Sequence, residues 1–320
     1  MGDINSTPSL VESLATDTRK GATQRDKFPE RLERYGKAKS LSNRMYQYIK
    51  KSVSYTPQNI KLAASIRECG DYLVFRDYYT VGEIRLSKAC FCKKHLLCPL
   101  CAIRRGTKQV QSKISQVKTV LSEHDNLEMF MVTLTVKDGE LLTERFNHLI
   151  KSMKFFINRR KRKNCTSEAR KILGSVWSYE FKKGKNSNLW HPHVHMIVLV
   201  EKSNPISQIS LSEEWYSITK DSFIVDVRRI KSNNDDEMVK GFCEVFKYAV
   251  KFSDQSPEDT WHCYERLKGR RLVGSCGLLY GVKEPDILTD EPLDELPYIE
   301  YFYQYLGGRY KTSYQEAVTS

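Results

Sequence analysis

The segment WHPHVHMIVLV, residues 190–200, places three of the chain's seven histidines within five positions. In an extended strand successive side chains point to opposite faces, so His191, His193 and His195 share one face. Neighbours on that face are about 7 Å apart, which allows two imidazoles to lean onto one cation. The pattern indicates a metal site, and a polar strand edge is the alternative interpretation.

A carboxylate that can join these imidazoles is Glu180, in the strand-like segment SVWSYEF. This segment precedes the turn-rich stretch KKGKNSN and then the histidine segment, so we expect the two strands to form a β-hairpin. One carboxylate and two imidazoles make a three-ligand site with open positions, where Mg²⁺ or Mn²⁺ can polarise a phosphate oxygen. The alternative for Glu180 is an exposed hairpin residue.

A second set of reactive side chains lies in CEVFKYAVKF, residues 243–252, where apolar spacing predicts a helix. Glu244 and Tyr248 are four residues apart and therefore lie one above the other on a helix. A tyrosine hydroxyl can attack a phosphodiester, and a nearby carboxylate can activate a water molecule. A solvated helix face is the alternative. The basic residues expected to hold DNA beside this pair are Lys240, Lys247 and Lys251.

Five cysteines lie within residues 60–101, and Cys98-Pro-Leu-Cys101 has the spacing of a tight turn that points two thiolates at one ion. Cys69 and Cys92 are the favoured other two ligands, and Cys90 or His95 could replace one of them. The alternatives are a core of reduced thiols and a redox pair. The sequence favours a structural Zn²⁺ held by Cys69, Cys92, Cys98 and Cys101.

The composition favours a polyanionic partner. The chain has 320 residues and a formal charge of +13, from 52 Lys and Arg against 39 Asp and Glu. Arg104 and Arg105 follow the cysteine turn and suit phosphate contact, with a solvated helix face as the alternative. No stretch approaches the roughly 20 apolar residues of a membrane span, and no apolar signal core is present. We therefore expect a cytoplasmic protein with no membrane partner.

The elements that must position these residues alternate along the chain. A strand at EMFMVTLTVKD, a helix at LLTERFNHLIKSMKFFINRR and the histidine hairpin are followed by a helix, the strand SFIVDVRRI and the Glu244 helix. This order predicts an α+β fold in which helices pack on a central antiparallel sheet, with a small zinc-knuckle module beside it. The expected divisions are a flexible basic leader (1–45), the zinc-knuckle module (46–105), the sheet domain (106–282) and an acidic, Tyr-rich C-terminal tail (283–320).

Three motifs in order, FMVTLTV, HPHVHMIVLV and EVFKYAVK, resemble those of the rolling-circle replication initiators of small plasmids, in the HUH endonuclease superfamily. CFCKKHLLCPLCAIRR and RRLVGSCGLL resemble stretches that flank the core of these proteins. The third motif is similar to the nucleophile helix of the group with one tyrosine and a glutamate four residues before it. The resemblance spans roughly residues 69–280 and implies an HUH endonuclease domain over 106–282.

The resemblance implies that His193, His195 and Glu180 bind the catalytic Mg²⁺ or Mn²⁺ and that Tyr248 nicks one strand at the plasmid origin. Tyr248 would keep the 5′ phosphate covalently, and Glu244 would activate the water of termination. His191 would contact DNA or support the ligands. A bacterial cytoplasmic location, a host helicase and a DNA polymerase follow from the same resemblance, and a homodimer is a further expectation.

Two other classes of function remain open at this point. One is another HUH enzyme, a conjugative relaxase or a single-strand transposase, although a relaxase typically places its tyrosine before the histidines. The other is a zinc-knuckle DNA-binding protein without catalysis, in which the histidine strand belongs to the core. Two segments are candidates for specific recognition of origin DNA: RRKRK, residues 159–163, and the region around the cysteines. For each, non-specific contact with phosphate is the alternative.

Overall fold

A computed structural model describes residues 27–162, 166–184, 186–231, 235–246, 255–282, 285–293 and 296–318. The chain divides into two compact units. Unit 1 comprises residues 1–108, 256–261 and 284–320, and unit 2 comprises residues 109–255 and 262–283. Helix α5 (Pro99–Glu123) contributes its first residues to unit 1 and the remainder to unit 2.

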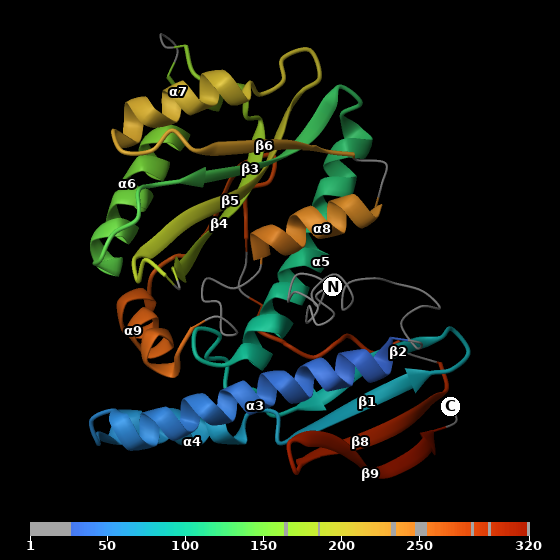
Figure 1. The fold of residues 1–320 in the computed structure, drawn as a ribbon. Helices are drawn as coiled ribbons and strands as arrows, with labels where there is room; N and C mark the ends of the chain where they lie inside the picture. Colours follow the sequence, from blue (N-terminus) through green and yellow to red (C-terminus); the bar gives the residue numbers. More distant parts are fainter. Residues whose placement is uncertain are drawn as a thin grey trace, which may run out of the picture. The chain divides into compact units, whose positions relative to one another are not determined.

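Unit 2 is built on a five-stranded antiparallel sheet of order β6-β3-β5-β4-β7 (Figure 1). The central strand β5 carries aliphatic residues at most positions after the histidines and is buried almost throughout, as expected for a strand covered on both faces. The strands are β3 (Leu127–Thr135), β4 (Gly174–Lys183), β5 (Trp190–Glu201), β6 (Val225–Ile230) and β7 (Val273–Gly277).

Helices cover both faces of this sheet (Figure 1). On one face, Phe146 of α6 packs edge-on against Phe181 of β4 at 4.9 Å between ring centroids. On the other face, α8 packs closely, because a Cβ at Gly241 would lie 2.6 Å from Cδ1 of Ile230. The helices are α6 (Leu142–Arg159), the 3₁₀ turn η1 (Glu168–Lys171), α7 (Gln208–Thr219) and α8 (Asp235–Phe246). Helix α9 (Pro257–Leu267) has its first residues in unit 1 and the remainder in unit 2.

The sequence prediction of an α+β fold is confirmed, including the antiparallel sheet and the β4–β5 hairpin. The alternation of strand and helix follows the hydrophobic periodicity, since buried residues recur every three or four positions in α6 and strand segments are rich in β-branched and aromatic residues.

Unit 1 contains a second antiparallel sheet, of order β2-β1-β8-β9, with α3 packed on one face. Phe28 of α3 packs edge-on against Phe75 of β1 at 4.8 Å between ring centroids, and Tyr35 of α3 stacks on Phe75 at 6.4 Å. The elements are α3 (Phe28–Ser52), α4 (Pro57–Glu68), β1 (Tyr72–Tyr78), β2 (Glu83–Ala89), β8 (Tyr298–Leu306) and β9 (Arg309–Val318).

The expected C-terminal tail is wrong for residues 298–318, which form the hairpin β8–β9 and pair with β1. Aromatic residues favour strands, and Gly307-Gly308 supplies the positive φ angles of the turn, so the segment is a hairpin and not a tail. The expected flexible leader is also wrong for residues 28–45, which belong to the helix α3. In α3 the buried residues Tyr35, Ser42 and Ile49 are seven positions apart.

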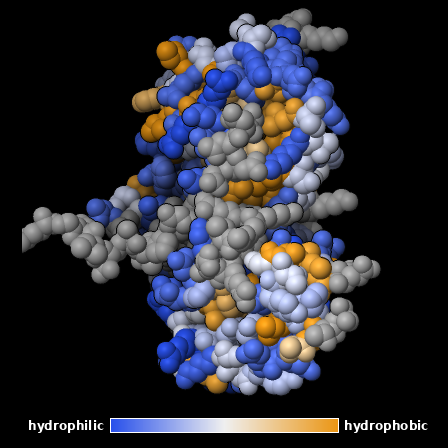
Figure 2. Space-filling view, turned by 90° about the vertical axis from the view of Figure 1, so that its right-hand side faces the viewer, coloured by the Kyte–Doolittle hydropathy of each residue, from blue (hydrophilic) through white to orange (hydrophobic). Residues whose placement is uncertain are grey.

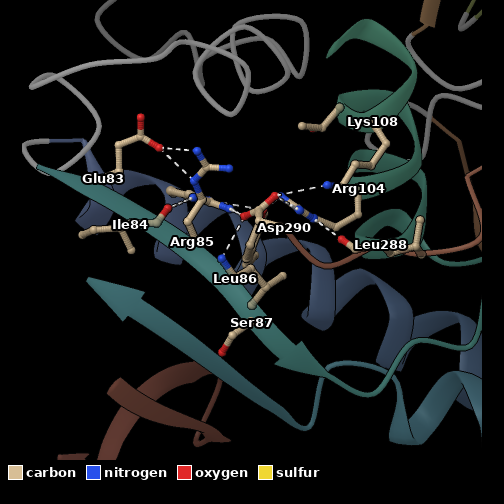
Figure 3. Close-up of polar contacts among 12 residues, drawn as sticks. Glu83, Ile84, Arg85, Leu86, Ser87, Arg104, Lys108, Leu288 and Asp290 are labelled. Atoms are coloured by element: carbon tan, nitrogen blue, oxygen red, sulfur yellow. Dashed lines mark hydrogen bonds and ion pairs between the residues drawn. The ribbon is translucent and has the colours of Figure 1, made fainter. Parts of the chain in front are cut away.

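Asp290 anchors the acidic segment that precedes β8. Its backbone N–H donates to the carbonyl oxygen of Leu86 at 2.7 Å, and its Oδ2 accepts from the Leu86 N–H at 2.8 Å. Its carboxylate also pairs with Arg104 of α5 at 2.5 Å and with Arg31 of α3 at 3.1 Å. Figure 3 shows Asp290 between β2 and α5. One buried carboxylate therefore joins three elements of unit 1.

The surface seen in Figure 2 is mainly hydrophilic, with hydrophobic residues in separate patches among the described residues. Within the described ranges, no helix has both the length and the apolar character that crossing a membrane requires.

Candidate metal centres

The hairpin register places Glu180 opposite His193 and Ser178 opposite His195. Paired residues share a face of the sheet, so the carboxylate and both imidazoles point the same way. Oε2 of Glu180 lies 3.4 Å from Nε2 of His193 and 3.3 Å from Nε2 of His195. All three side chains are buried, and one ligand atom from each lies within 4.8 Å of the others. The predicted ligands therefore converge on one point.

The other ring nitrogens are held by neighbouring groups. Nδ1 of His195 lies 3.2 Å from Oγ1 of Thr133, and Nδ1 of His193 lies 3.4 Å from the carbonyl oxygen of His191. A carbonyl oxygen can only accept, so this contact favours the His193 tautomer with its proton on Nδ1, which leaves the Nε2 lone pair for a cation. This donor set of two imidazoles and one carboxylate fits a divalent metal with open positions.

Thr133 was not predicted as a site residue. It lies on β3 directly opposite His195, and Thr135 lies opposite His193. The signal was present in FMVTLTV, where two threonines alternate with apolar residues and therefore share one face of the strand. Three strands thus contribute to the polar face of the sheet.

His191 lies outside the three-ligand cluster. Its Nδ1 pairs with Oδ1 of Asp138, which follows β3, and its side chain is 40 % exposed, whereas those of His193 and His195 are each 11 % exposed. Its backbone oxygen, however, orients His193. His191 therefore contributes to the site through its backbone and presents its ring toward solvent.

Helix α8 lies on the histidine face of the sheet. The hydroxyl of Ser178 on β4 donates to the carbonyl oxygen of Val245. This bond ties the last turn of α8 to the residue opposite His195, and it fixes the backbone next to Glu244, whose side chain is half-buried. Lys240 is exposed on the same helix. The predicted Tyr248, Lys247 and Lys251 lie outside the described residues.

The four predicted cysteines of unit 1 also come together. Sγ of Cys69 lies 3.5 Å from the sulfurs of Cys98 and Cys101, and Sγ of Cys92 lies 3.6 Å from that of Cys101. A disulfide would require about 2.05 Å. Four sulfurs bound tetrahedrally to zinc at about 2.3 Å would be about 3.8 Å apart, so the cluster fits a Cys₄ zinc site.

Tertiary contacts hold the cysteine cluster from several sides. Gly70, at φ 70°, turns the chain after Cys69, and a Cβ there would lie 2.5 Å from Cδ2 of Leu100. The hydroxyl of Tyr310 donates to the Gly70 carbonyl at 2.6 Å, and Nζ of Lys39 donates to the Cys69 carbonyl at 2.9 Å. The strand β9 and the helix α3 therefore fix the backbone that carries Cys69.

The close sulfurs perturb one another's protonation. Hydrogen bonding from Cys101 and Cys69 lowers the pKa of Cys98, and hydrogen bonding with Cys69 raises the pKa of Cys101. Thiolates at this spacing repel, so deprotonating all four requires a cation between them. Cys90 and His95 are not part of the four-residue cluster.

Arg104 does not fit its predicted contact with DNA phosphate. Its side chain is fully buried and pairs with Asp290, while its Nε donates to the Leu288 carbonyl at 2.8 Å. It was assigned to a surface because it follows the cysteine turn on an amphipathic helix, but its partner is 186 residues away in sequence. Arg105, the next residue, is half-buried.

Comparison with known proteins identifies the family. A replication protein family matches residues 83–301, which include the three histidines, Glu180 and three of the four clustered cysteines. The chain belongs to this replication protein family. The match confirms the resemblance to plasmid replication initiators and is consistent with the HUH superfamily.

Several relatives of this replication protein carry the name Protein rep. One from Bacillus sp is 28% identical over 257 residues, which cover 70% of this chain and 80% of the relative. Another from Bacillus amyloliquefaciens is 26% identical over 289 residues, covering 80% and 81%. A third from Staphylococcus aureus is 28% identical over 236 residues, covering 70% and 94%. No solved structure gives a significant match.

Proposed function

We propose that this replication protein initiates rolling-circle replication by nicking and rejoining one DNA strand at a plasmid origin. The observation that carries the proposal is the convergence of Glu180, His193 and His195 on a buried face of the sheet, beneath the helix that bears Glu244. Two imidazoles and a carboxylate suit Mg²⁺ or Mn²⁺ at a phosphodiester.

A bound metal would supply Lewis-acid polarisation of the scissile phosphate. Glu180, His193 and His195 would bind it, and Thr133 would orient the His195 ring. The Tyr248 hydroxyl would lose its proton and attack phosphorus; the bond to the 3′ oxygen would break, and that oxygen would leave as a protonated hydroxyl. The protein would keep the 5′ phosphate as a tyrosine ester, whose energy allows rejoining without ATP.

Termination would use Glu244 of α8 as a general base. Its carboxylate would take a proton from water, and the water oxygen would attack the phosphorus of the nick site in the terminating cleavage. The bond from that phosphorus to the 3′ oxygen would break, and this oxygen would leave as a protonated hydroxyl. One tyrosine would then suffice for both ends of the cycle. Lys240, Lys247 and Lys251 would hold the strand beside this helix. A host helicase and a DNA polymerase would extend the free 3′ hydroxyl. The four cysteines would hold a structural Zn²⁺ in unit 1.

A covalent-adduct assay tests the proposal. The full chain is incubated with Mn²⁺ and a labelled single strand that carries the nick site, and a protein–DNA band that survives denaturation is measured. We expect wild type to form the band and Tyr248→Phe and Glu180→Gln to lose it. Tyr280→Phe is the matched control, since Tyr280 is 71% exposed and lies outside α8. A band of wild-type intensity from Tyr248→Phe contradicts the mechanism.

Glu244→Ala separates nicking from termination. This variant should form the covalent band at a rate close to that of wild type but fail to release monomeric circles in a replication assay. Normal release by Glu244→Ala contradicts the general-base role. A wild-type chain that binds origin DNA and forms no band would favour a non-catalytic DNA-binding protein.

A further inference from the structure

The helical pair α3 and α4 carries an unusual charge distribution. Residues 43–67 contain five basic residues and no Asp or Glu, although the whole chain has 39 acidic residues. All five basic side chains are exposed. A predominantly basic surface attracts a polyanion. Glu68, the last residue of α4, follows this stretch and lines the smaller of two hollows there. The five residues are Arg44, Lys50, Lys51, Lys61 and Arg67.

Two hollows lie along this surface in unit 1, and Tyr46 and Arg67 line both. The guanidinium carbon of Arg67 lies 5.8 Å from the centroid of the Tyr46 ring, so the pair forms the partition between them. The larger hollow has a volume of about 420 Å³, and the smaller, about 200 Å³, is lined mainly by apolar residues such as Ile49 and Val53.

The larger hollow has the side chains that recognise a nucleobase. Tyr46 and Tyr305 offer aromatic rings for stacking, and Asn43, Gln47 and Gln304 offer carboxamides that can donate to and accept from base edges. Asn43 and Gln47 lie four residues apart, so they share one side of α3.

The acidic residue of this hollow does not oppose a polyanion. Asp71 lines the hollow, but its Oδ1 pairs with Nζ of Lys39 at 2.7 Å. Because Lys39 and Asp71 offset each other's charge, Arg67 sets the charge of the site.

We propose that α3 and α4 form a single-stranded DNA-binding surface that holds an unpaired base in the larger hollow. Stacked bases of a duplex cannot enter such a hollow, whereas an unstacked base can lie against a tyrosine ring. The proposal rests on the proposed function for its ligand, the single strand exposed at an origin. It assigns base recognition to unit 1 and leaves strand cleavage to unit 2.

Fluorescence anisotropy of a labelled oligodeoxythymidine of about 20 nucleotides measures this binding. The full chain carries Glu180→Gln as background, so cleavage cannot alter the probe. We expect Tyr46→Ala to weaken binding about tenfold or more, because base stacking on an aromatic ring contributes about 1–3 kcal/mol. Tyr46→Phe should bind nearly as well as the background. Arg67→Ala should make the slope of log binding constant against log salt concentration shallower by about 0.7, the value for one lost phosphate contact on a single strand.

Tyr79→Ala and Lys88→Ala are the matched controls, since both residues are exposed on the β1–β2 side of unit 1 and line neither hollow. Their affinity should equal the background value. Gln47→Ala should change the order of preference among oligomers of A, C and T. Zinc content and melting temperature, measured for every variant, show that unit 1 is folded.

Two results overturn the proposal: wild-type affinity in folded Tyr46→Ala and Arg67→Ala, or an equal loss of affinity for duplex DNA in these variants. The second result would identify a duplex-binding surface. Failure of the nuclease mechanism can be distinguished from failure of this binding proposal. If only the nuclease mechanism is wrong, wild type forms no covalent band, but the variants still differ in anisotropy. Conversely, Tyr46→Ala should still form the band at saturating DNA when Glu180 is intact.

Discussion

The two candidate metal centres are built in different ways. Glu180, His193 and His195 lie on adjacent strands of one hairpin, so the sheet register brings them together. Cys69, in contrast, follows α4, while Cys98 and Cys101 lie at the start of α5, and α3 and β9 hold the turn after Cys69. Backbone hydrogen bonds between β4 and β5 therefore set the geometry of the Glu180–His193–His195 cluster. In the second cluster a bound ion would be needed to hold the four thiolates together, so the two clusters should respond differently to loss of a ligand.

Cys101→Ser should have the largest effect. Structural Zn²⁺ contributes apparent binding free energies of about 10–16 kcal/mol in zinc-finger peptides, and this free energy is coupled to folding. We expect the variant to lose zinc and unit 1 to unfold at ordinary temperature, while the sheet of unit 2 retains a cooperative transition. Metal analysis and differential scanning calorimetry measure the two outcomes.

Cys90→Ser is the control for this prediction, because Cys90 is half-buried near the cluster without belonging to it. It should retain full zinc content and a wild-type melting profile. Zinc content near zero in folded wild-type protein would remove the contrast between the two clusters.

Asp290→Asn should produce the next largest effect, again within unit 1. The change leaves Arg31 and Arg104 buried without their carboxylate, and breaking such a buried pair costs about 3–5 kcal/mol. Chemical denaturation at neutral pH measures the loss. Glu300→Gln is the comparison, because the Arg76–Glu300 pair is partly exposed and should contribute no more than about 1 kcal/mol.

The same carboxylate predicts a pH dependence. Burial by itself would raise the pKa of Asp290, but Arg104 and Arg31 outweigh it and hold that pKa well below the usual range. An acid with a lowered folded-state pKa contributes stability that is complete above its ordinary pKa, near 3.9, and is lost as the pH falls below that value. Asp290→Asn should therefore flatten the acid limb of the stability curve of unit 1. An unchanged limb would contradict the assignment.

The sequence predicts the local part of each candidate metal centre. The residues that share a face of the hairpin follow from the alternation of strand side chains, so the sequence alone places Glu180 and the histidines together. The C-x-x-C spacing likewise indicated Cys98 and Cys101. Both predictions depend on local geometry, and the partners of each residue lie nearby in sequence.

Long-range partners were the part that the sequence did not predict. Burial of Arg104 depends on Asp290, 186 residues away, and a basic residue on an amphipathic helix has the same local pattern whether it is paired or solvated. The hairpin β8–β9 was missed because the acidic residues around it favoured a tail, although YIEYFYQYLGGRYKTSYQ contains two β-prone runs about a Gly-Gly turn. The acidic composition of this segment indicated a tail and its alternation of β-prone runs indicated a hairpin, and the structure has the hairpin.

His193→Ala tests the sheet half of the comparison. Loss of a metal ligand should lower the nicking rate by more than about 100-fold, which is the upper range for removing a group that only orients a ligand. The backbone register that positions the site does not depend on the ion, so the melting temperature of unit 2 should change little. Nicking rates and calorimetry on the same sample separate these effects. A collapse of unit 2 would show that this site, too, is held by its metal.

Thr133→Val should have the smallest effect and is the most specific test of the sheet site. The substitution keeps the β-branched shape but removes the hydroxyl that lies 3.2 Å from Nδ1 of His195. An orienting partner of a ligand typically contributes about 10-fold or more to metal affinity or activity. We therefore expect about a tenfold lower nicking rate that higher Mn²⁺ partly restores, with zinc content unchanged. Thr119→Val is the control, because Thr119 is an exposed α5 residue whose hydroxyl donates within its own helix. If Thr133→Val nicks like wild type at limiting Mn²⁺, backbone register alone orients His195, and the contrast between a site set by the sheet and a site set by tertiary contacts becomes sharper.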